Sequence, residues 1–348
     1  MLDMEVILED GSAWSGFGKG GTAQGEVVFT TASSGYPQAL SDPSFAGQIL
    51  VFAFPMVGNY GVDEEALESS RPWVRAVVVD SLEDGRSLGT SLGEWLSLFD
   101  IPFMWGVDTR SIIRHIRSKG ALMGCITPSG EGFTVMGKER GHPARDVSIA
   151  TTEVIEGAGP TIVVVDYGLK HGIQRKLSAR GCRVVKVPHN TSAAEILSWK
   201  PDGVLLGNGP GDPSLLKEET EVVRALLGKI PLGGICLGLQ VIALASGAST
   251  YKLPFGHRGA NHAVIECARG RGFVTSQNHG YAVLDESLER TGLEITHRNL
   301  GDGSVEGLKS RDMRVVAVQY HPEGAPGPRD DDRFFEEFLS MCDEGATP

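Results

Sequence analysis

A cysteine flanked by two glycines restricts the fold of this chain more than any other feature. In Gly234-Ile235-Cys236-Leu237-Gly238, the cysteine follows a short apolar run at 228–233 and precedes a helix-forming run at 239–245. This order is typical of a nucleophile elbow, in which a strand ends, the chain turns sharply and the nucleophile stands at the start of a helix. A side chain at position 234 or 238 would collide with the neighbouring strand and helix. The positive end of the helix dipole favours a thiolate at Cys236.

Length and charge limit the class of protein. A chain of 348 residues predicts two domains, and a net charge of −12 argues against nucleic acid or an anionic membrane as a partner. The longest uncharged apolar stretch, 49–62, is shorter than the roughly 20 residues of a membrane span. The N-terminus lacks a secretory signal, and the five cysteines form no C-x-x-C pair. We therefore expect a cytoplasmic protein with reduced thiols and no metal site.

The first domain is expected to cover residues 1–155. Short β-rich runs separated by Gly, Ser and Pro extend to about residue 127, and a helix is predicted over 109–119, with Asp108 as its N-cap and Gly120 as its C-cap. This pattern of short strands with one helix indicates a smaller, mixed α+β domain. Residues 128–160 are polar and glycine-rich without periodicity, which predicts a connector.

The second domain is expected to cover residues 161–345, where strand and helix signals alternate. The β-branched run at 161–165 predicts a parallel strand that is buried on both faces. Further strands are predicted at 183–187 and 203–206, and helices at 172–180, 192–199 and 214–227. The pattern indicates an α/β fold with an open, mostly parallel sheet and helices on both faces. Its site would lie at the carboxyl ends of the strands, where the elbow and the loop after Leu206 emerge.

A base for the cysteine is available in His321-Pro322-Glu323, which follows the strand-like run 315–320. A histidine at a strand end can take the thiol proton and return it to a leaving amine, and a carboxylate two residues later can orient the imidazole. Alone, the segment also fits a turn with solvated side chains. A lone cysteine is most often a small buried hydrophobic residue. The glycine-flanked position between strand and helix favours the nucleophile for Cys236, and the other four cysteines are interpreted as structural.

Two further segments fit a polar site. The loop Gly207-Asn208-Gly209-Pro210-Gly211-Asp212-Pro213 follows the third strand and has the composition of loops that direct N–H groups at an oxyanion, although a plain tight turn fits equally well. It lacks the Gly-Lys-Ser/Thr ending of a phosphate loop, which occurs nowhere in the chain. Residues 277–283 place Asn278 and backbone groups beside Tyr281, which suits a small amide or a hydrogen-bonded surface turn.

Together, the segments 234–240, 208–213 and 321–323 resemble the class I, or triad, glutamine amidotransferases in order and spacing. The N-terminal region narrows the resemblance to the small subunit of carbamoyl phosphate synthetase, and the match covers nearly the whole chain. The segments that carry it are Leu-Glu-Asp-Gly at 8–11, Thr-Ala-Ser-Ser-Gly-Tyr-Pro at 31–37, Ser-Asp-Pro-Ser-Phe at 41–45, Gly-Asn-Tyr-Gly at 58–61, Val-Asp-Thr-Arg at 107–110 and Phe-Gly-His-Arg-Gly-Ala-Asn-His at 255–262.

The resemblance implies a role for each matching residue. Cys236 would attack the glutamine side-chain amide, His321 would act as base and then acid, and Glu323 would orient the imidazole. Backbone N–H groups of Gly209 and Leu237 would stabilise the oxyanion. The residues expected to hold glutamine are Ser44, which would reach the site from the other domain, Gly211, Gln240, Asn278, Gly280 and Tyr281.

The resemblance also implies a partner. A large subunit would use the ammonia, bicarbonate and ATP with Mg²⁺ to make carbamoyl phosphate for arginine or pyrimidine synthesis, and the N-terminal domain would dock to it in a heterodimer. No cofactor is expected on this chain. The alternatives are an amidotransferase serving another synthase, a non-catalytic regulatory or scaffold protein, and a cysteine hydrolase of peptides or γ-glutamyl compounds.

Three positions depart from the family pattern. Leu239 stands where many relatives have histidine, residues 323–325 read Glu-Gly-Ala rather than Glu-Ala-Ser, and Tyr281 is often phenylalanine. None of these departures removes a group expected to take part in catalysis, so we expect them to alter affinity only.

Overall fold

The computed structural model describes residues 2–131, 141–328 and 333–343, and the chain divides into two compact units. Unit 1 comprises residues 1–141 and 254–259, and unit 2 comprises 142–253 and 260–348. Residues 142–155, which the sequence assigned to the first domain, therefore belong with unit 2. The predicted connector also contains α4 (Pro143–Val147) and β10 (Glu153–Ile155), which are too short to give a periodic signal, while its residues 132–140 lie outside the described part.

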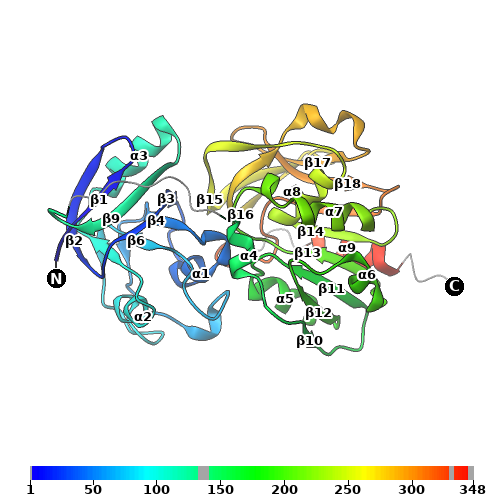
Figure 1. The fold of residues 1–348 in the computed structure, drawn as a ribbon, viewed down its shortest axis with the longest axis horizontal. Coiled ribbons are helices and arrows are strands. Elements are labelled where there is room, and N and C mark those ends of the chain that lie inside the picture. The colour runs from blue at the N-terminus through cyan, green and yellow to red at the C-terminus, as the bar shows by residue number, and fades with distance from the viewer. Residues whose placement is uncertain (1, 132–140, 329–332, 344–348) are drawn as a thin grey trace. The chain divides into compact units, whose positions relative to one another are not determined.

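Unit 1 gives the predicted mixed α+β domain the form of a closed barrel with strand order β1-β2-β8-β6-β4-β3-β9 (Figure 1). Successive side chains of β4 point to opposite faces of the strand, and both faces are packed. Ile49 and Val51 pack with α3, whereas Leu50 and Phe52 pack with α1 and α2. The elements are β1 (Leu2–Leu8), β2 (Ala13–Lys19), β3 (Ala23–Thr30), α1 (Tyr36–Ser41), β4 (Gln48–Phe52), β5 (Met56–Val57), β6 (Ala76–Val78), β7 (Ser81–Leu82), α2 (Leu92–Leu98), β8 (Phe103–Trp105), α3 (Thr109–Lys119) and β9 (Leu122–Pro128).

Helix α3 has the predicted bounds and caps. The Asp108 side chain accepts a hydrogen bond from the Ser111 N–H at 2.9 Å, and Gly120 ends the helix with a φ of 94°. A carboxylate acceptor at one end and a glycine with positive φ at the other are strong local signals, which is why the sequence alone located this helix.

Unit 2 contains a ten-stranded sheet with the order β10-β12-β11-β13-β14-β19-β18-β17-β15-β16. The strands β12, β11, β13, β14 and β19 are parallel, as predicted, and Figure 1 shows β11, β13 and β14 side by side. The prediction of a mostly parallel sheet is wrong, because β10, β18, β17 and β15 pair antiparallel with their neighbours. Antiparallel strands need no crossover helix, so this half of the sheet lacks the strand–helix alternation on which the prediction depended.

Helices cover both faces of the sheet, as predicted. In β11, Val163 and Val165 pack with α6, α7 and α8, while Ile162 and Val164 pack with α5 and α9. The elements of unit 2 not yet given are β11 (Thr161–Asp166), α5 (His171–Ser178), β12 (Arg183–Pro188), α6 (Ala193–Ser198), β13 (Gly203–Leu206), α7 (Lys217–Leu226), β14 (Leu232–Ile235), α8 (Leu237–Ala245), β15 (Thr250–Glu266), β16 (Arg271–Val283), β17 (Glu294–Asn299), β18 (Val305–Ser310), β19 (Val315–Val318) and α9 (Arg333–Asp343).

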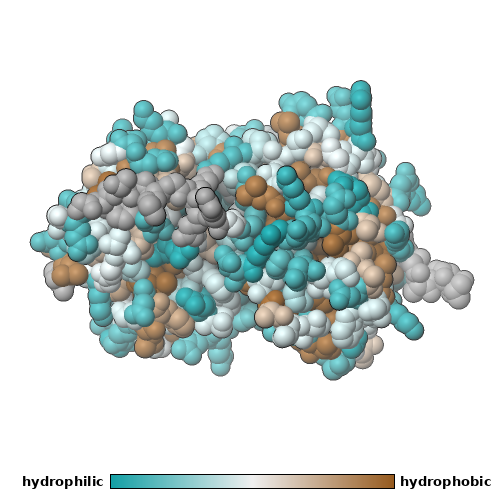
Figure 2. Space-filling model, in the orientation of Figure 1, coloured by the Kyte–Doolittle hydropathy of each residue, from teal (hydrophilic) through white to brown (hydrophobic). Residues whose placement is uncertain are grey.

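Among the residues described, no helix is long and apolar enough to cross a membrane. On the face drawn in Figure 2, hydrophilic side chains are interspersed with small, separated groups of hydrophobic ones.

Candidate active site

The structure confirms the predicted strand, turn and helix around Cys236. β14 ends at Ile235 and α8 begins at Leu237, so Cys236 is the N-cap residue between them. Its backbone has φ 55° and ψ −105°, a conformation that costs a residue with a side chain about 1–3 kcal/mol. The thiol is buried and donates to the Asn278 carbonyl oxygen at an S–O distance of 3.6 Å.

The two flanking glycines are required by close packing, as expected from the sequence. A Cβ on Gly238 would lie 2.2 Å from the carbonyl oxygen of Leu206 in the neighbouring strand β13. A Cβ on Gly234 would lie 2.8 Å from the Ile242 Cδ1 of helix α8. Both distances are far below ordinary van der Waals contact, so a larger residue would displace the turn that holds Cys236.

The sheet brings His321 to the same edge as Cys236. β14 and β19 are parallel with Ile235 opposite Val318, and the Cys236 N–H donates to the Val318 carbonyl at 2.8 Å. His321 follows three residues after β19 and its N–H donates to the Ser276 carbonyl at 2.9 Å. The carboxyl ends of adjacent parallel strands thus place a thiol and an imidazole together, as the sequence predicted.

The imidazole is held by Glu323. The distance from His321 Nδ1 to Glu323 Oε1 is 2.6 Å, and both side chains are almost fully buried. The other ring nitrogen, Nε2, has no hydrogen-bond partner of normal geometry among the described residues. Nδ1 is therefore occupied by the carboxylate, and Nε2 is left for a reacting group.

Lys170 completes this group and was missed by the sequence analysis. Its Nζ donates to Glu323 Oε1 at 2.7 Å, and its side chain is 1% exposed. Asp166 at the end of β11 accepts from the N–H groups of Gly168 and Leu169, which forms the turn that leads to Lys170. The available signal was its place just beyond the carboxyl end of a predicted parallel strand, the edge where the site was expected.

Burial and charge act against each other on His321 and Glu323. Burial disfavours the imidazolium, but the Glu323 carboxylate and the interaction with the Cys236 side chain outweigh it and raise the pKa of His321 to about 10. Burial also disfavours the carboxylate, but the charges of Lys170 and His321 hold the pKa of Glu323 well below its usual value. The arrangement stabilises a charged imidazolium at His321, which interacts with the Cys236 side chain.

The loop at 207–213 lies next to the elbow. A Cβ on Gly209 would lie 2.9 Å from Leu237 Cδ2 and 2.2 Å from the Tyr167 carbonyl oxygen, so the two residues predicted to form an oxyanion hole are neighbours. Asn208 is fully buried, and its Oδ1 accepts from the Lys170 N–H at 3.1 Å. Gly211 has a φ of 94°, which favours glycine.

The predicted glutamine-binding residues of unit 2 also gather at this edge. Gln240 Nε2 donates to the Tyr281 carbonyl at 2.7 Å and to Gln319 Oε1 at 2.9 Å. Asn278, Gly280 and Tyr281 lie in strand β16 rather than in a turn. Gln319 is a further polar residue that the sequence analysis missed. Ser44 lies in unit 1, in the 3-10 helix Pro43–Phe45, and its role in the site stays a prediction.

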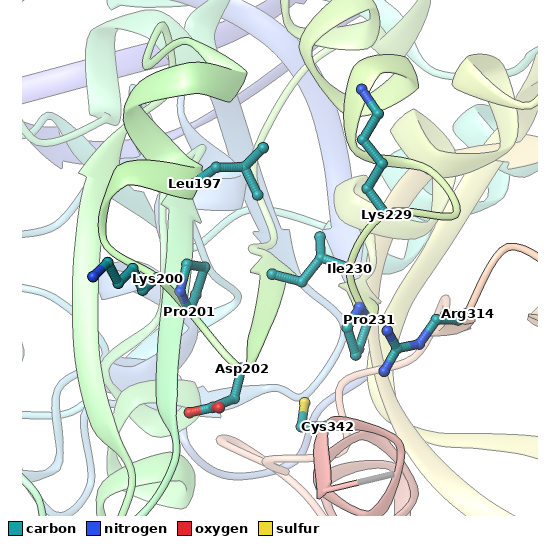
Figure 3. Close-up of a pocket in the computed structure, with 9 residues that line it drawn as sticks. All are labelled: Leu197, Lys200, Pro201, Asp202, Lys229, Ile230, Pro231, Arg314 and Cys342. Carbon is teal, nitrogen blue, oxygen red and sulfur yellow. The ribbon is translucent and has the colours of Figure 1, made fainter. Parts of the chain in front are cut away.

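A cavity of about 280 Å³ in unit 2 is not part of this site. It lies at the amino ends of β13 and β14, where Asp202 and Pro231 precede the strands, whereas Gly207 and Cys236 follow their carboxyl ends. Figure 3 shows the lysine side chains at its margin pointing away from the cavity.

Known proteins share both parts of the chain. The sequence model of the family described as glutamine amidotransferase class-I matches residues 163–341, and that of the carbamoyl-phosphate synthase small chain, CPSase domain, matches residues 6–126. The carbamoyl phosphate synthase small chain of Bacillus thuringiensis subsp. konkukian (strain 97-27) is 47% identical over 353 residues, which cover 98% of this chain and 96% of that protein. The chain belongs to the carbamoyl phosphate synthase small chain family.

Other members of the small chain family match over similar lengths. The small chain of Symbiobacterium thermophilum is 46% identical and covers 98% of this chain and 99% of that protein. The pyrimidine-specific small chain of Bacillus subtilis (strain 168) is 44% identical, and the match covers 98% of this chain and 96% of that protein. The small-chain domain at 6–126 falls within unit 1, and the amidotransferase domain at 163–341 contains Cys236, His321 and Glu323. The family resemblance seen in the sequence is thereby confirmed.

Proposed function

We propose that this small chain is the glutaminase subunit of a carbamoyl phosphate synthase. It hydrolyses L-glutamine to glutamate and ammonia at Cys236 and passes the ammonia to a large subunit. The large subunit uses ATP, Mg²⁺ and bicarbonate to make carbamoyl phosphate, and this chain holds no cofactor. The relatives are named as small chains, which supports a larger partner, and we assign the docking surface to the N-terminal domain, unit 1.

The reaction follows from the roles of the side chains. The Cys236 thiolate attacks the carboxamide carbon, and the backbone N–H groups of Gly209 and Leu237 stabilise the oxyanion. The His321 imidazolium gives its proton to the leaving nitrogen as the C–N bond breaks, which releases ammonia and leaves a thioester. Water then loses a proton to His321 and attacks the thioester, which releases glutamate and restores the thiolate.

One observation carries the proposal: His321 is oriented by Glu323 through Nδ1, while Nε2 remains available beside a cysteine on a strained elbow. A scaffold protein or a structural cysteine would not require a nucleophile, a base and an orienting carboxylate at one sheet edge. Gln240, Asn278 and Tyr281 supply amide and carbonyl groups that suit a free amino-acid amide. All five cysteines are free thiols, which fits the proposed cytoplasmic location.

The test is Cys236→Ser in the complex with the large subunit. Glutamine-dependent carbamoyl phosphate synthesis should fall by about a thousandfold or more, since serine lacks the thiolate. Synthesis from added ammonium should be unchanged, because that reaction bypasses this chain. The matched control is Cys267→Ser, which alters an exposed free thiol and should leave both activities intact. Glutamine-dependent synthesis by the Cys236→Ser complex would exclude Cys236 as the nucleophile.

A further inference from the structure

His142 lies against the loop that carries Gly209 and Gly211, and both of its ring nitrogens are engaged. Nδ1 accepts from the Ala144 N–H at 3.2 Å, and Nε2 meets the Asp212 carbonyl oxygen at 2.9 Å. A backbone N–H can only donate and a carbonyl can only accept, so the ring must be neutral with its proton on Nε2. The side chain is 4% exposed, and burial lowers its pKa, which agrees with the neutral form.

The ring and the loop are in close contact at Gly211. A Cβ on this glycine would lie 2.9 Å from both Cε1 and Nε2 of His142. Because Gly211 has no side chain, the loop backbone can lie directly on the imidazole while Asp212 accepts its hydrogen bond. His142 thus contacts the loop at two successive residues, next to the positions proposed to bind glutamine and the oxyanion.

The segment that carries His142 is anchored elsewhere in unit 2. Arg145 Nε and Nη2 donate to the two carboxylate oxygens of Glu219 in α7 at 3.1 and 3.3 Å, and the Glu219 side chain is 1% exposed. His189 Nδ1 lies 2.9 Å from the same carboxylate. The Ile149 N–H donates to Asp166 Oδ2 at 3.0 Å. The sheet and α7 therefore hold the segment in place independently of the loop.

We propose that His142 is a positioning residue for glutamine hydrolysis: it fixes the Asp212 carbonyl and thereby the backbone of Gly209 and Gly211. The inference rests on the proposed function, because it assigns that loop to substrate and oxyanion binding. A second proton on Nδ1 would face the Ala144 N–H and end the bond to it. The charged groups that act on the ring are Glu219, Arg145 and Asp212. The neutral ring with its proton on Nε2 is therefore the form that makes both hydrogen bonds.

Two substitutions separate the two hydrogen bonds of His142. Asparagine can replace Nδ1 as the acceptor for the Ala144 N–H, as an effective N-cap, but it is too short to reach Asp212. Glutamine places an amide N–H near the position of Nε2 and can keep the bond to Asp212, but it is a poor N-cap. A positioning role predicts that His142→Asn harms activity more than His142→Gln, whereas a purely capping role predicts the reverse order.

The measurements are glutaminase kinetics and amide hydrogen exchange of residues 207–213. For His142→Asn we expect kcat/KM for glutamine to fall about tenfold, the effect of one lost hydrogen bond, with faster exchange in the loop. For His142→Gln we expect less than about a threefold loss, since that bond persists. The control is Ser192→Ala, which removes the capping box of α6 and should change neither measurement.

The outcomes distinguish the two proposals. Unchanged loop exchange in His142→Asn, or a larger loss of kcat/KM in His142→Gln than in His142→Asn, would refute the role of His142. A wild-type complex that releases no glutamate would instead refute the proposed function. Amide hydrogen exchange of residues 207–213 would then still show whether His142 holds the loop.

Discussion

Replacing Lys170 by methionine tests the buried ion pair on which the site depends. Lys170 Nζ lies 2.7 Å from Glu323 Oε1, and the two side chains are 1% and 0% exposed. Methionine keeps much of the volume of the lysine stem but removes its charge. The substitution leaves the Glu323 carboxylate buried with His321 as its remaining charged partner.

The expected loss of stability is large. Removing one member of a buried ion pair costs about 3–5 kcal/mol, because the other charge stays buried without full compensation. Since His321 still contacts Glu323, we expect the lower part of this range, about 3 kcal/mol. For a domain of roughly 150–250 residues, this corresponds to a fall of about 6–12 °C in the Tm of unit 2. Lys229→Met removes an exposed lysine and should change stability by less than about 0.5 kcal/mol.

The assay must report on unit 2 alone, because a chain of two units need not unfold in one step. The slowest amide hydrogens of β11 and β13 give the free energy of unfolding of the sheet that carries the site. A double-mutant cycle with Glu323→Gln then isolates the pair. Because Lys170→Met/Glu323→Gln contains neither buried charge, it should be more stable than the sum of the single effects predicts. Additivity within about 0.5 kcal/mol would refute the reasoning.

Two further predictions concern strain and protonation. Cys236 has a φ of 55°, so Cys236→Gly should be more stable than Cys236→Ala by about 1–3 kcal/mol in the same exchange assay, a reversal of the usual order of these residues. Equal stability would show that the elbow is not strained. Burial opposes the imidazolium of His321, but Glu323 raises its pKa from 6.5 to about 10. This contribution to stability is fully present below pH 6.5 and lost as the pH rises toward 10, so the stability advantage of wild type over His321→Asn should shrink across that interval. An advantage that grows with pH would contradict this assignment.

The sequence predicted those parts of the fold whose signals are local. The glycines around Cys236 and the β-branched run of β11 each lie within a few adjacent residues. These short segments predict a turn and a buried strand without information about distant partners. The antiparallel strands β15 to β18 could not be predicted in the same way. β17 pairs with β18 and β18 with β19 across short turns, but β17 also pairs with β15, which is separated from it by β16. Without crossover helices these strands leave no strand–helix alternation in the sequence.

The residues of the candidate site differ in the same way: some lie in short sequence motifs and others do not. Cys236, His321 and Glu323 stand in short motifs, and the structure places their side chains together. Lys170 belongs to no such motif. Its partner Glu323 is 153 positions away, so no short stretch of sequence indicates their contact. A lysine just before a helix ordinarily indicates an exposed residue, and only the folded chain shows that this one meets a carboxylate inside unit 2.

Lys170 also changes what His321 can do in the proposed reaction. The Glu323 carboxylate raises the pKa of His321, whereas the Lys170 ammonium lowers it, so the two charges oppose each other at the imidazole. An imidazolium held too strongly by a buried carboxylate would release its proton poorly to the leaving nitrogen. By sharing Oε1 of Glu323 with His321, the Lys170 ammonium keeps the buried carboxylate ionised and weakens the attraction of the carboxylate for the His321 proton. The buried lysine thus lets one carboxylate orient the imidazole without preventing proton transfer.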